Sequence, residues 1–412
     1  MTDPRTVVVV GASVAGVRTA QSLRTEGFGG RIVLVGDEPD LPYDKPPLSK
    51  QFLTGCWSVE RIALLTAEAA AAAEIELRLG VAAQRLDVAD RQVVLIDGST
   101  IDYDAAVLAT GAAARPAPWS PTSGVHVLRS MADARALRDD LEVDRPVVII
   151  GGGFIGAEVA ATAHALGREV TVVDPLSAPI GRVVGREVGE LFVDLHTRHG
   201  VTTKFGVGVE SVEGEAGDLT VQLTDGSQLA AGTVVVGIGA VPNDGWLAGS
   251  GLLVDDGVVC DEHCRAVDAA DVYAVGDVLR WFHPGHGEHV RVEHWTNAVE
   301  SAAVVAHNIA HPEELRSHCP VEYVWSDQYD WKIQIVGRPV GATRHTLVGD
   351  LTSAHPRGAA VYADDSGDLR GAVAVNWPKA LLVCRRAVGA GASFDDVVAQ
   401  LDRLSAAGAA PA

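Results

Sequence analysis

Three glycines at fixed spacing carry the clearest chemical signal in this sequence. Gly151, Gly153 and Gly156 follow the apolar run VVII and precede a stretch with helical periodicity. In such a turn the first glycine allows a tight bend, the second lets the backbone approach a pyrophosphate, and the third lets the helix pack on the strand. The N-terminus of the following helix adds positive potential for the phosphates. The pattern therefore predicts a dinucleotide-binding turn.

A second copy near the N-terminus departs from this pattern at one position. Gly11 and Gly16 hold the outer positions, but Ser13 replaces the middle glycine. Serine is the smallest change that still permits a close approach, although it weakens the match. An acidic residue placed for a ribose follows each copy about 20 residues later, Asp37 in the first and Asp174 in the second. Two such turns predict two dinucleotides, and the usual pair is a tightly held flavin and an exchangeable nicotinamide.

The elements that must position these turns are repeated as well. Residues 6–38 and 146–174 each read as a β-branched strand, a glycine turn, a helix and a second strand, which is a βαβ unit. Further strands end at Thr110 and Gly111, and at Asp277. We therefore predict an α/β fold with two Rossmann-like dinucleotide-binding domains.

Two further segments are predicted from their local sequence patterns, and only the second of them is expected to carry no chemistry. Residues 317–412 alternate short apolar stretches with turn residues and end in helical periodicity, which predicts a small α+β domain. The alanine-rich segment 67–80 is expected to be helical.

Composition narrows the class of protein. The chain has 412 residues, enough for two or three domains, and hydrophobic residues make up 47% of it. Its 33 lysines and arginines against 54 aspartates and glutamates give a net charge of -21, which disfavours nucleic acids and anionic membrane surfaces. Five scattered cysteines, and an N-terminus without a basic segment before a long apolar run, indicate a reducing compartment. We expect a cytoplasmic protein that binds neither nucleic acid nor membrane.

Four short segments extend the pattern beyond the glycine turns. They are PYDKPPLSK (42–50), EHWTNA (293–298), SDQYD (326–330) and VNWP (375–378). Taken together with the two glycine turns and in their order along the chain, these segments resemble the two-dinucleotide-binding flavoproteins of the glutathione-reductase type. The chain resembles more closely the ferredoxin reductases of haem monooxygenases and aromatic-ring dioxygenases, the putidaredoxin reductase group. The likeness covers nearly the whole chain.

The resemblance implies an enzyme with FAD and NADH as cofactors. Hydride would pass from NADH to the flavin, and single electrons would pass on to an iron-sulfur ferredoxin that supplies a haem monooxygenase or ring dioxygenase. Residues 1–114 and 238–316 would form the FAD domain, and residues 115–237 the NAD domain. Residues 317–412 would form a C-terminal α+β domain that covers the flavin.

The proline-rich segment carries the first catalytic residue that the resemblance implies, Lys50. It would stabilise negative charge on the reduced flavin, and Glu158 would orient both Lys50 and the nicotinamide. Residues 39–55 contain no cysteine, whereas a disulfide reductase needs two beside its flavin. The prolines limit the conformations of the loop and help to hold a long side chain in place. Without the resemblance, Lys50 reads as a solvated loop lysine.

The motifs and the resemblance together assign the site residues to two groups. The FAD group is Gly11, Ser13, Ala15, Gly16, Asp37, Lys50, Ala83, Thr110, Gly111, Arg129, Asp277, Trp295 and Trp377. The NAD group is Gly151, Gly153, Ile155, Gly156, Glu158, Asp174 and Gly239. A carboxylate at Asp174 accepts ribose hydroxyls and repels a 2′-phosphate, which favours NADH over NADPH.

Two clusters suggest metal binding but favour other interpretations. Cys260, His263 and Cys264 in CDEHC have poor zinc spacing without a second cluster, so a hairpin with buried thiols is expected. The histidines of HPGHGEH (283–289) are expected in an exposed turn. We predict no metal site.

Two other functions stay open. One is an NADH oxidase or disulfide reductase on the same fold, against which the missing cysteine near residue 45 argues. The other is a slow-turnover, NADH-binding signalling flavoprotein, which fast turnover would exclude. An acidic ferredoxin would need a local basic patch on this acidic chain. The candidates, all expected in the C-terminal domain, are Lys332, Arg338, Arg344, Lys379, Arg385 and Arg386.

Overall fold

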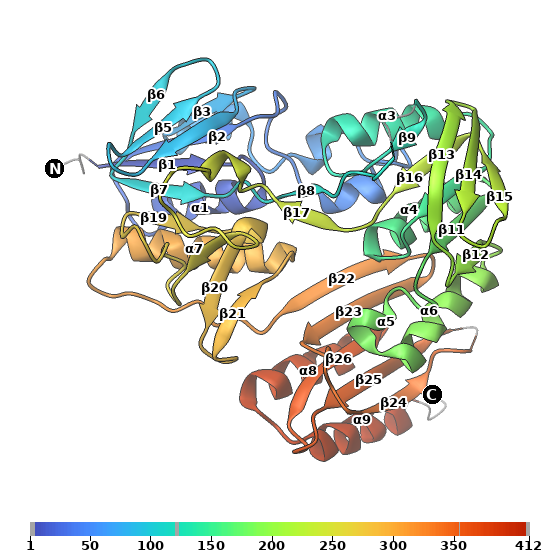
Figure 1. Ribbon diagram of the computed structural model, residues 1–412. Helices are drawn as coiled ribbons and strands as arrows, with labels where there is room; N and C mark the ends of the chain where they lie inside the picture. The colour runs from blue at the N-terminus through green and yellow to red at the C-terminus, as the bar shows by residue number, and fades with distance from the viewer. Residues whose placement is uncertain (1–4, 120–122, 354, 409–412) are drawn as a thin grey trace. The chain divides into compact units, whose positions relative to one another are not determined.

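The computed structural model describes residues 5–119, 123–353 and 355–408, which form two compact units (Figure 1). The first unit comprises Met1–Pro47, Trp57–Ala113 and Ala240–Pro320. The second unit comprises Leu48–Cys56, Ala114–Gly239 and Val321–Ala412. The three domains predicted from the sequence stay a prediction. These units divide the chain close to all three expected boundaries, but they group residues 114–239 with 321–412 and place 48–56 in the second unit.

A parallel sheet forms the centre of the first unit, with the strand order β19-β7-β1-β2-β3. The strands are β1 (Thr6–Val10), β2 (Arg31–Gly36), β3 (Ile75–Leu79), β7 (Ala105–Leu108) and β19 (Val272–Ala274). Val7, Val8 and Val9 in β1 are fully buried because the sheet is covered on both faces, which explains the unbroken apolar run. Helices α1 (Val14–Thr25) and α7 (Trp295–Ala310) pack side by side.

Smaller sheets complete the first unit. One sheet contains β4 (Ala83–Asp87), β5 (Gln92–Leu95) and β6 (Thr100–Asp102), while the short helix α2 (Ala67–Ala72) packs next to β3. Another contains β18 (Val258–Cys260), β20 (Leu279–His283) and β21 (Glu288–Arg291). The pair β8 (Ala112–Ala114) and β17 (Ala240–Pro242) lies where the chain passes between the units.

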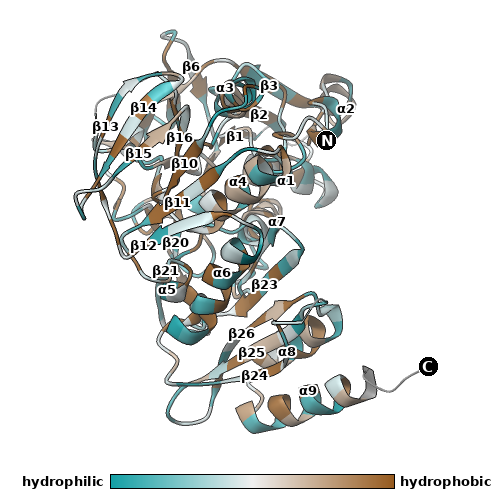
Figure 2. Cartoon of the chain, turned by 90° about the vertical axis from the view of Figure 1, so that its right-hand side faces the viewer, coloured by the Kyte–Doolittle hydropathy of each residue, from teal (hydrophilic) through white to brown (hydrophobic). Residues whose placement is uncertain are grey.

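The second unit contains its own parallel sheet, with the order β12-β11-β10-β16-β9. The strands are β9 (Val125–His126), β10 (Val147–Ile150), β11 (Val170–Asp174), β12 (Thr202–Phe205) and β16 (Thr233–Val236). The accompanying helices are α3 (Met131–Leu141), α4 (Phe154–Ala165), α5 (Gly181–Val184) and α6 (Arg186–Arg198). An antiparallel sheet follows with β13 (Val209–Glu215), β14 (Asp218–Leu223) and β15 (Gln228–Ala231). Figure 2 shows β10 in hydrophobic colour, as expected of a central strand.

The rest of the second unit is an antiparallel sheet with two helices. Its order is β22-β23-β26-β25-β24. The strands are β22 (Tyr323–Gln328), β23 (Trp331–Gly337), β24 (Arg344–Asp350), β25 (Arg357–Ala363) and β26 (Leu369–Val375). Helices α8 (Pro378–Ala390) and α9 (Phe394–Gly408) pack against it, and α9 alternates apolar and polar surface (Figure 2). The predicted fold class, two Rossmann-like folds with a C-terminal α+β part, is confirmed.

Two local predictions were wrong in part. The segment 67–80 is helical only to Ala72; Glu74 has a φ of 52°, and Ile75–Leu79 is strand β3, paired in parallel with β2. The turn of HPGHGEH is present between β20 and β21, but His283 is only 2% exposed, because it ends a buried strand.

The cysteines behave as expected of reduced thiols. All five are free, and Cys260 and Cys264 are buried within CDEHC. Burial raises the pKa of both thiols, so neither ionises near neutral pH. His263 lies 3.0 Å from the Arg316 carbonyl oxygen, and its ring is thereby engaged with backbone. The prediction of buried thiols in this segment is confirmed.

Candidate functional site

The first glycine turn joins β1 to α1. Gly11 has a φ of 117°, and a Cβ added there would lie 2.1 Å from the carbonyl oxygen of Ala109. A Cβ on Gly16 would lie 1.8 Å from the Gly11 carbonyl oxygen. Any side chain at these two positions would collide with backbone, so the turn itself requires both glycines.

The second glycine turn, between β10 and α4, repeats this geometry. Gly151 has a φ of 106°, and a Cβ on Gly156 would lie 1.9 Å from the Gly151 carbonyl oxygen. The backbone N–H of Gly151 donates to Val173 of the neighbouring strand at 2.8 Å. Each turn is therefore fixed by the parallel strand beside it.

The open space at the middle position of the two turns explains why the first turn can carry a serine there. Ser13 and Gly153 are both helix N-caps, with φ values of −96° and −71°, which any residue can adopt. A Cβ added to Gly153 would meet nothing within 4 Å, and the Ser13 side chain makes no capping hydrogen bond. The protein leaves this space open in front of a helix N-terminus, where a pyrophosphate fits. The residues present therefore fit a dinucleotide in both turns.

The acidic residues that end the second strands differ in their surroundings. Asp37 is exposed after β2. Its neighbour Glu38 accepts a hydrogen bond from the Tyr43 hydroxyl at 2.5 Å and pairs with Lys45 at 3.2 Å. Asp174 accepts backbone N–H bonds from Gly152 at 2.9 Å and from residue 176 at 2.8 Å. Each carboxylate oxygen of Asp174 keeps a second lone pair for a ribose hydroxyl.

Two of the other predicted FAD segments are anchored close to the first turn. Gly276, which precedes Asp277, has so little room that an added Cβ would lie 3.0 Å from the Cβ of Ala15 in α1. The turn at Thr110 is locked by two hydrogen bonds with Asn243, at 2.7 and 2.9 Å. The structure therefore brings Asp277 and the start of α1 together within the first unit.

The proline-rich loop contributes to both units. In the first unit, Asp44 accepts a hydrogen bond from the Trp295 indole N–H at 2.8 Å. In the second unit, Lys50 forms an ion pair with Glu158 of α4, with Nζ and Oε2 2.6 Å apart. The exposed fractions of the two side chains are only 13% and 5%, so Lys50 is not the solvated loop lysine that its local sequence suggests.

Further polar side chains complete this cluster around the Glu158 carboxylate. Ser49 donates to Oε2 at 2.5 Å, and Ser326 of β22 donates to Oε1 at 2.8 Å. Thr162, one turn along α4 from Glu158, donates to the Ser49 carbonyl oxygen at 2.7 Å. The carboxylate is therefore held on both oxygens, as a buried charge requires. Ser49 and Ser326 were missed from the sequence, although both lie in the segments PYDKPPLSK and SDQYD.

The turn of SDQYD is fastened to α6. Tyr329, with a φ of 52°, stacks on His199 at 4.2 Å between ring centroids, and its hydroxyl lies 2.8 Å from Nδ1 of His196. Burial, assisted by His199, lowers the pKa of His196 to about 4, so its ring is neutral. These contacts of Tyr329 with α6 help to hold β22, and with it Ser326, beside α4.

Other predicted residues lie elsewhere in their units. Ala83 begins β4 in the first unit. Ile155, at the start of α4, is 46% exposed, and Gly239 has a φ of 105°. Arg129 and Trp377 belong to the second unit, and Trp377 is 4% exposed in the apolar cluster under α8. The assignment of Ala83, Arg129 and Trp377 to FAD, and of Ile155 and Gly239 to NAD, stays a prediction.

Comparison with known proteins agrees with this geometry. Residues 5–302 match the model of the pyridine nucleotide-disulphide oxidoreductase family, and residues 323–403 match the reductase C-terminal family. Rhodocoxin reductase of Rhodococcus erythropolis is 38% identical over 84% of this chain and 81% of its own. The anthranilate 1,2-dioxygenase system ferredoxin–NAD(+) reductase component of Burkholderia cepacia is also 38% identical, over 94% and 95%.

A solved structure extends the likeness to the whole fold. The reductase in the covalent putidaredoxin reductase–putidaredoxin complex superposes with a TM-score of 0.91 and 32% identity, covering 98% of this chain and 99% of that one. The chain therefore belongs to the pyridine nucleotide-disulphide oxidoreductase family.

Proposed function

We propose that the chain is an FAD-dependent NADH:ferredoxin reductase. It takes hydride from NADH and passes electrons singly to an iron-sulfur ferredoxin, which supplies a haem monooxygenase or a ring dioxygenase. The observation that carries this is the pair of open glycine turns together with one ion pair. That pair joins Lys50, in the loop where a disulfide reductase has cysteines, to Glu158 of α4. The relatives above, whose names are those of such reductases and of which the chain covers 81% or more, support it.

The chain's residues divide between two cofactors. Gly11, Ser13 and Gly16 with Asp277 would hold FAD, and Gly151, Gly153 and Gly156 with Asp174 would hold NADH. FAD would supply the conversion of a two-electron hydride donor into a one-electron donor. The protein's part is to bind, orient and balance charge.

Lys50 has the character of a fixed positive charge. Its ammonium group is held by the Glu158 carboxylate, which in turn is fixed by Ser49 and Ser326. A cation positioned in advance can stabilise negative charge that develops on a bound cofactor, without reorganisation during the reaction. We assign Lys50 that role and Glu158 the role of holding it.

The outer face of α8 offers a docking surface for an acidic carrier. Lys379, Leu382, Arg385 and Arg386 lie three, four and seven residues apart, so they share one side of the helix. Leu382 is 57% exposed, and all three cations are exposed. This side of the helix therefore has an apolar centre and a charged rim, as protein–protein interfaces commonly do. Arg344, another candidate from the sequence, already pairs with Asp395 at 2.7 Å and is a weaker choice.

The chain also has features of a cytoplasmic protein, which is where we place it. All five cysteines are free, including the exposed Cys56 and Cys319, as in a reducing compartment. In the part of the chain that the structure describes, every helix is too short or too polar to cross a membrane.

Acceptor selectivity tests the proposal. The FAD-loaded protein and NADH should reduce a ferredoxin far faster than an aryl disulfide or oxygen. Faster turnover with the disulfide or with oxygen would identify a disulfide reductase or an NADH oxidase. Reduction of the flavin by NADH, without transfer of its electrons to any of these acceptors, would favour the slow-turnover signalling flavoprotein.

A further inference from the structure

A cluster of three potential ligands lies at one end of the first unit, away from the glycine turn. Glu26 caps the C-terminal end of α1, while His307 lies in the last turn of α7 and His311 caps that helix. Oε2 of Glu26 is 3.0 Å from Nδ1 of His307 and 3.2 Å from Nε2 of His311. The ligand atoms of all three side chains lie within 4.8 Å of one another.

The ring of His307 faces acceptors on both sides. Its Nδ1 faces the Glu26 carboxylate, and its Nε2 lies 2.9 Å from the carbonyl oxygen of Glu314. A neutral imidazole carries one N–H and can donate to only one of these acceptors. A cation between Nδ1 and the carboxylate resolves this conflict and leaves Nε2–H to donate to Glu314. A ring N–H that donates to a backbone carbonyl is also the usual support of a metal-binding histidine.

The spacing suits a small transition-metal ion. With bonds of about 2.0 Å in a tetrahedral arrangement, neighbouring ligand atoms lie about 3.3 Å apart. The separations of 3.0 and 3.2 Å from Glu26 to the two histidines agree with this value. His307 is buried and His311 is 43% exposed, so two histidines and one carboxylate leave a position open to water.

The electrostatic setting favours a cation as well. The C-terminal ends of α1 and α7 meet here, and each carries partial negative charge. Glu26 adds a carboxylate beside these helix ends, with its Oε2 close to both histidine rings. The opposing charge is Arg316, whose guanidinium lies 3.8 Å from the other carboxylate oxygen, Oε1.

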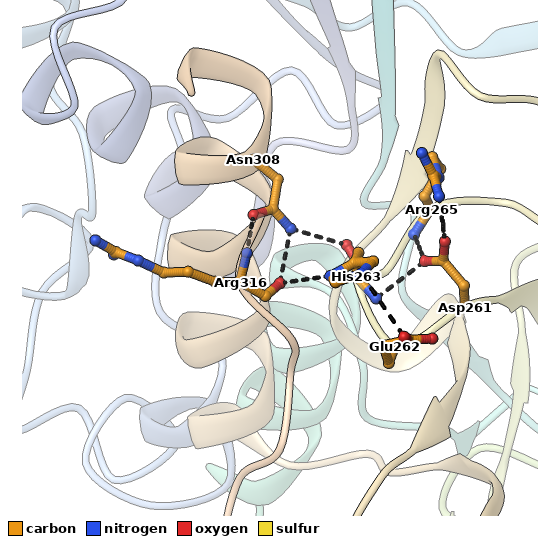
Figure 3. Close-up of polar contacts among 6 residues, drawn as sticks. All are labelled: Asp261, Glu262, His263, Arg265, Asn308 and Arg316. Atoms are coloured by element: carbon orange, nitrogen blue, oxygen red, sulfur yellow. Dashed lines mark hydrogen bonds and ion pairs between the residues drawn. The ribbon is translucent and has the colours of Figure 1, made fainter. Parts of the chain in front are cut away.

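The segment after α7 is rigid where it supports His307. Figure 3 shows Asn308 and His263 holding the backbone of Arg316. The Arg316 N–H donates to the Asn308 side chain at 2.7 Å, and the Arg316 carbonyl oxygen accepts from the Asn308 amide at 2.9 Å. The backbone N–H of Glu314 donates to His311 at 3.0 Å. These bonds fix the Glu314 carbonyl behind the His307 ring.

We propose that Glu26, His307 and His311 bind a divalent transition-metal ion, with Zn²⁺ as the best match to two nitrogens and one carboxylate. The ion would clamp the ends of α1 and α7. Because α1 has 12 residues, the site lies about 18 Å along the helix from the dinucleotide turn, so its role is structural. No sequence motif indicates this cluster, because Glu26 and His307 are far apart in the chain.

Zinc titration of the chelator-stripped, FAD-loaded full chain tests this inference. We expect one Zn²⁺ per chain, bound at least ~10-fold more weakly in Glu26→Gln and His311→Ala. The matched control is His289→Ala, which alters another exposed histidine of the same unit and should bind zinc normally. Zinc should raise the melting temperature of the wild type and of the control, but not of the two ligand variants.

X-ray absorption of the zinc-loaded wild type distinguishes this site from the exposed thiols. Bonds to nitrogen and oxygen are about 2.0 Å long, whereas bonds to sulfur are about 2.3 Å. A sulfur shell, equal zinc affinity in all variants, or no stoichiometric binding by the wild type would overturn the proposal. In the last case the cluster would be an ion pair between Glu26 and a doubly protonated His307.

Discussion

Replacing Glu158 with glutamine tests the buried cluster of the second unit. The carboxylate accepts hydrogen bonds from Lys50 and Ser49 on one oxygen and from Ser326 on the other. A glutamine side chain has only one acceptor oxygen, and its NH₂ group would face the donors on the opposite side. The variant therefore leaves the Lys50 ammonium group without a counter-ion in a largely buried position.

The size of this effect follows from burial. Lys50 and Glu158 are 13% and 5% exposed, so solvent screens their interaction poorly. Removal of one partner of a buried pair costs roughly 3–5 kcal/mol. Because Lys50 keeps some contact with water, we expect the lower end, about 3 kcal/mol, which is a change of roughly 100-fold in a local opening equilibrium.

Hydrogen exchange measured by mass spectrometry reports this loss locally. Protection of the amides in α4 and β22 should fall roughly 100-fold in Glu158→Gln. The control is Glu190→Gln, which breaks an ion pair with Arg186 that is 84% exposed on the arginine side. An exposed pair of this kind contributes about 0–1 kcal/mol, so the control should remain close to the wild type.

A double variant completes the test. In Lys50→Met with Glu158→Gln neither charge is left alone, so protection should recover part of the loss seen in Glu158→Gln. Protection within two-fold of the wild type in Glu158→Gln alone would refute the claim that the pair is buried and strongly coupled.

Three further predictions concern the NADH turn, the docking surface and pH. Gly153→Ala should weaken NADH binding about 10-fold in titration calorimetry without lowering the melting temperature, since its Cβ meets only ligand space. Gly156→Ala should lower the melting temperature, because its Cβ collides with backbone. Identical effects of the two variants would contradict this reasoning. Replacing Arg385 and Arg386 with glutamate should slow ferredoxin reduction roughly ten-fold at low salt and leave ferricyanide reduction unchanged; equal losses would refute docking there. The depressed pKa of His196, about 4, means that the unfolded chain binds more protons below pH 6.5, so stability falls as the pH is lowered, by about 2 kcal/mol in all between pH 6 and 4. His196→Asn should flatten the fall in melting temperature, and an unchanged slope would contradict this.

The glycine turns could be predicted because their requirements are local. Gly11 and Gly16 collide with nearby backbone if they gain a side chain, and this constraint depends only on a strand followed at once by a helix. The segment 75–79 was misread for the opposite reason. Its alternating Ile75, Leu77 and Leu79 indicate a strand, but the alanine run before it obscured that period, and its partner β2 lies forty residues away.

The polar cluster was only partly predictable. Lys50 and Glu158 came from the resemblance, whereas the bond from Ser326 to Glu158 joins residues 168 positions apart. No pattern in the sequence predicts such a contact, because it forms only when two distant parts of the chain pack together. The burial of His283 was missed because a Gly-rich context suggested an exposed turn, while the residue itself ends strand β20.

Anaerobic rapid mixing tests the account most directly. The FAD-loaded protein is mixed with one equivalent of NADH while the flavin band is followed, and then with an oxidised ferredoxin. The account predicts rapid bleaching, then rapid recovery with two ferredoxins reduced per NADH, because a hydride carries two electrons and a ferredoxin accepts one. Bleaching that only an aryl disulfide reverses, or a long-lived reduced state that no ferredoxin reoxidises, would contradict it.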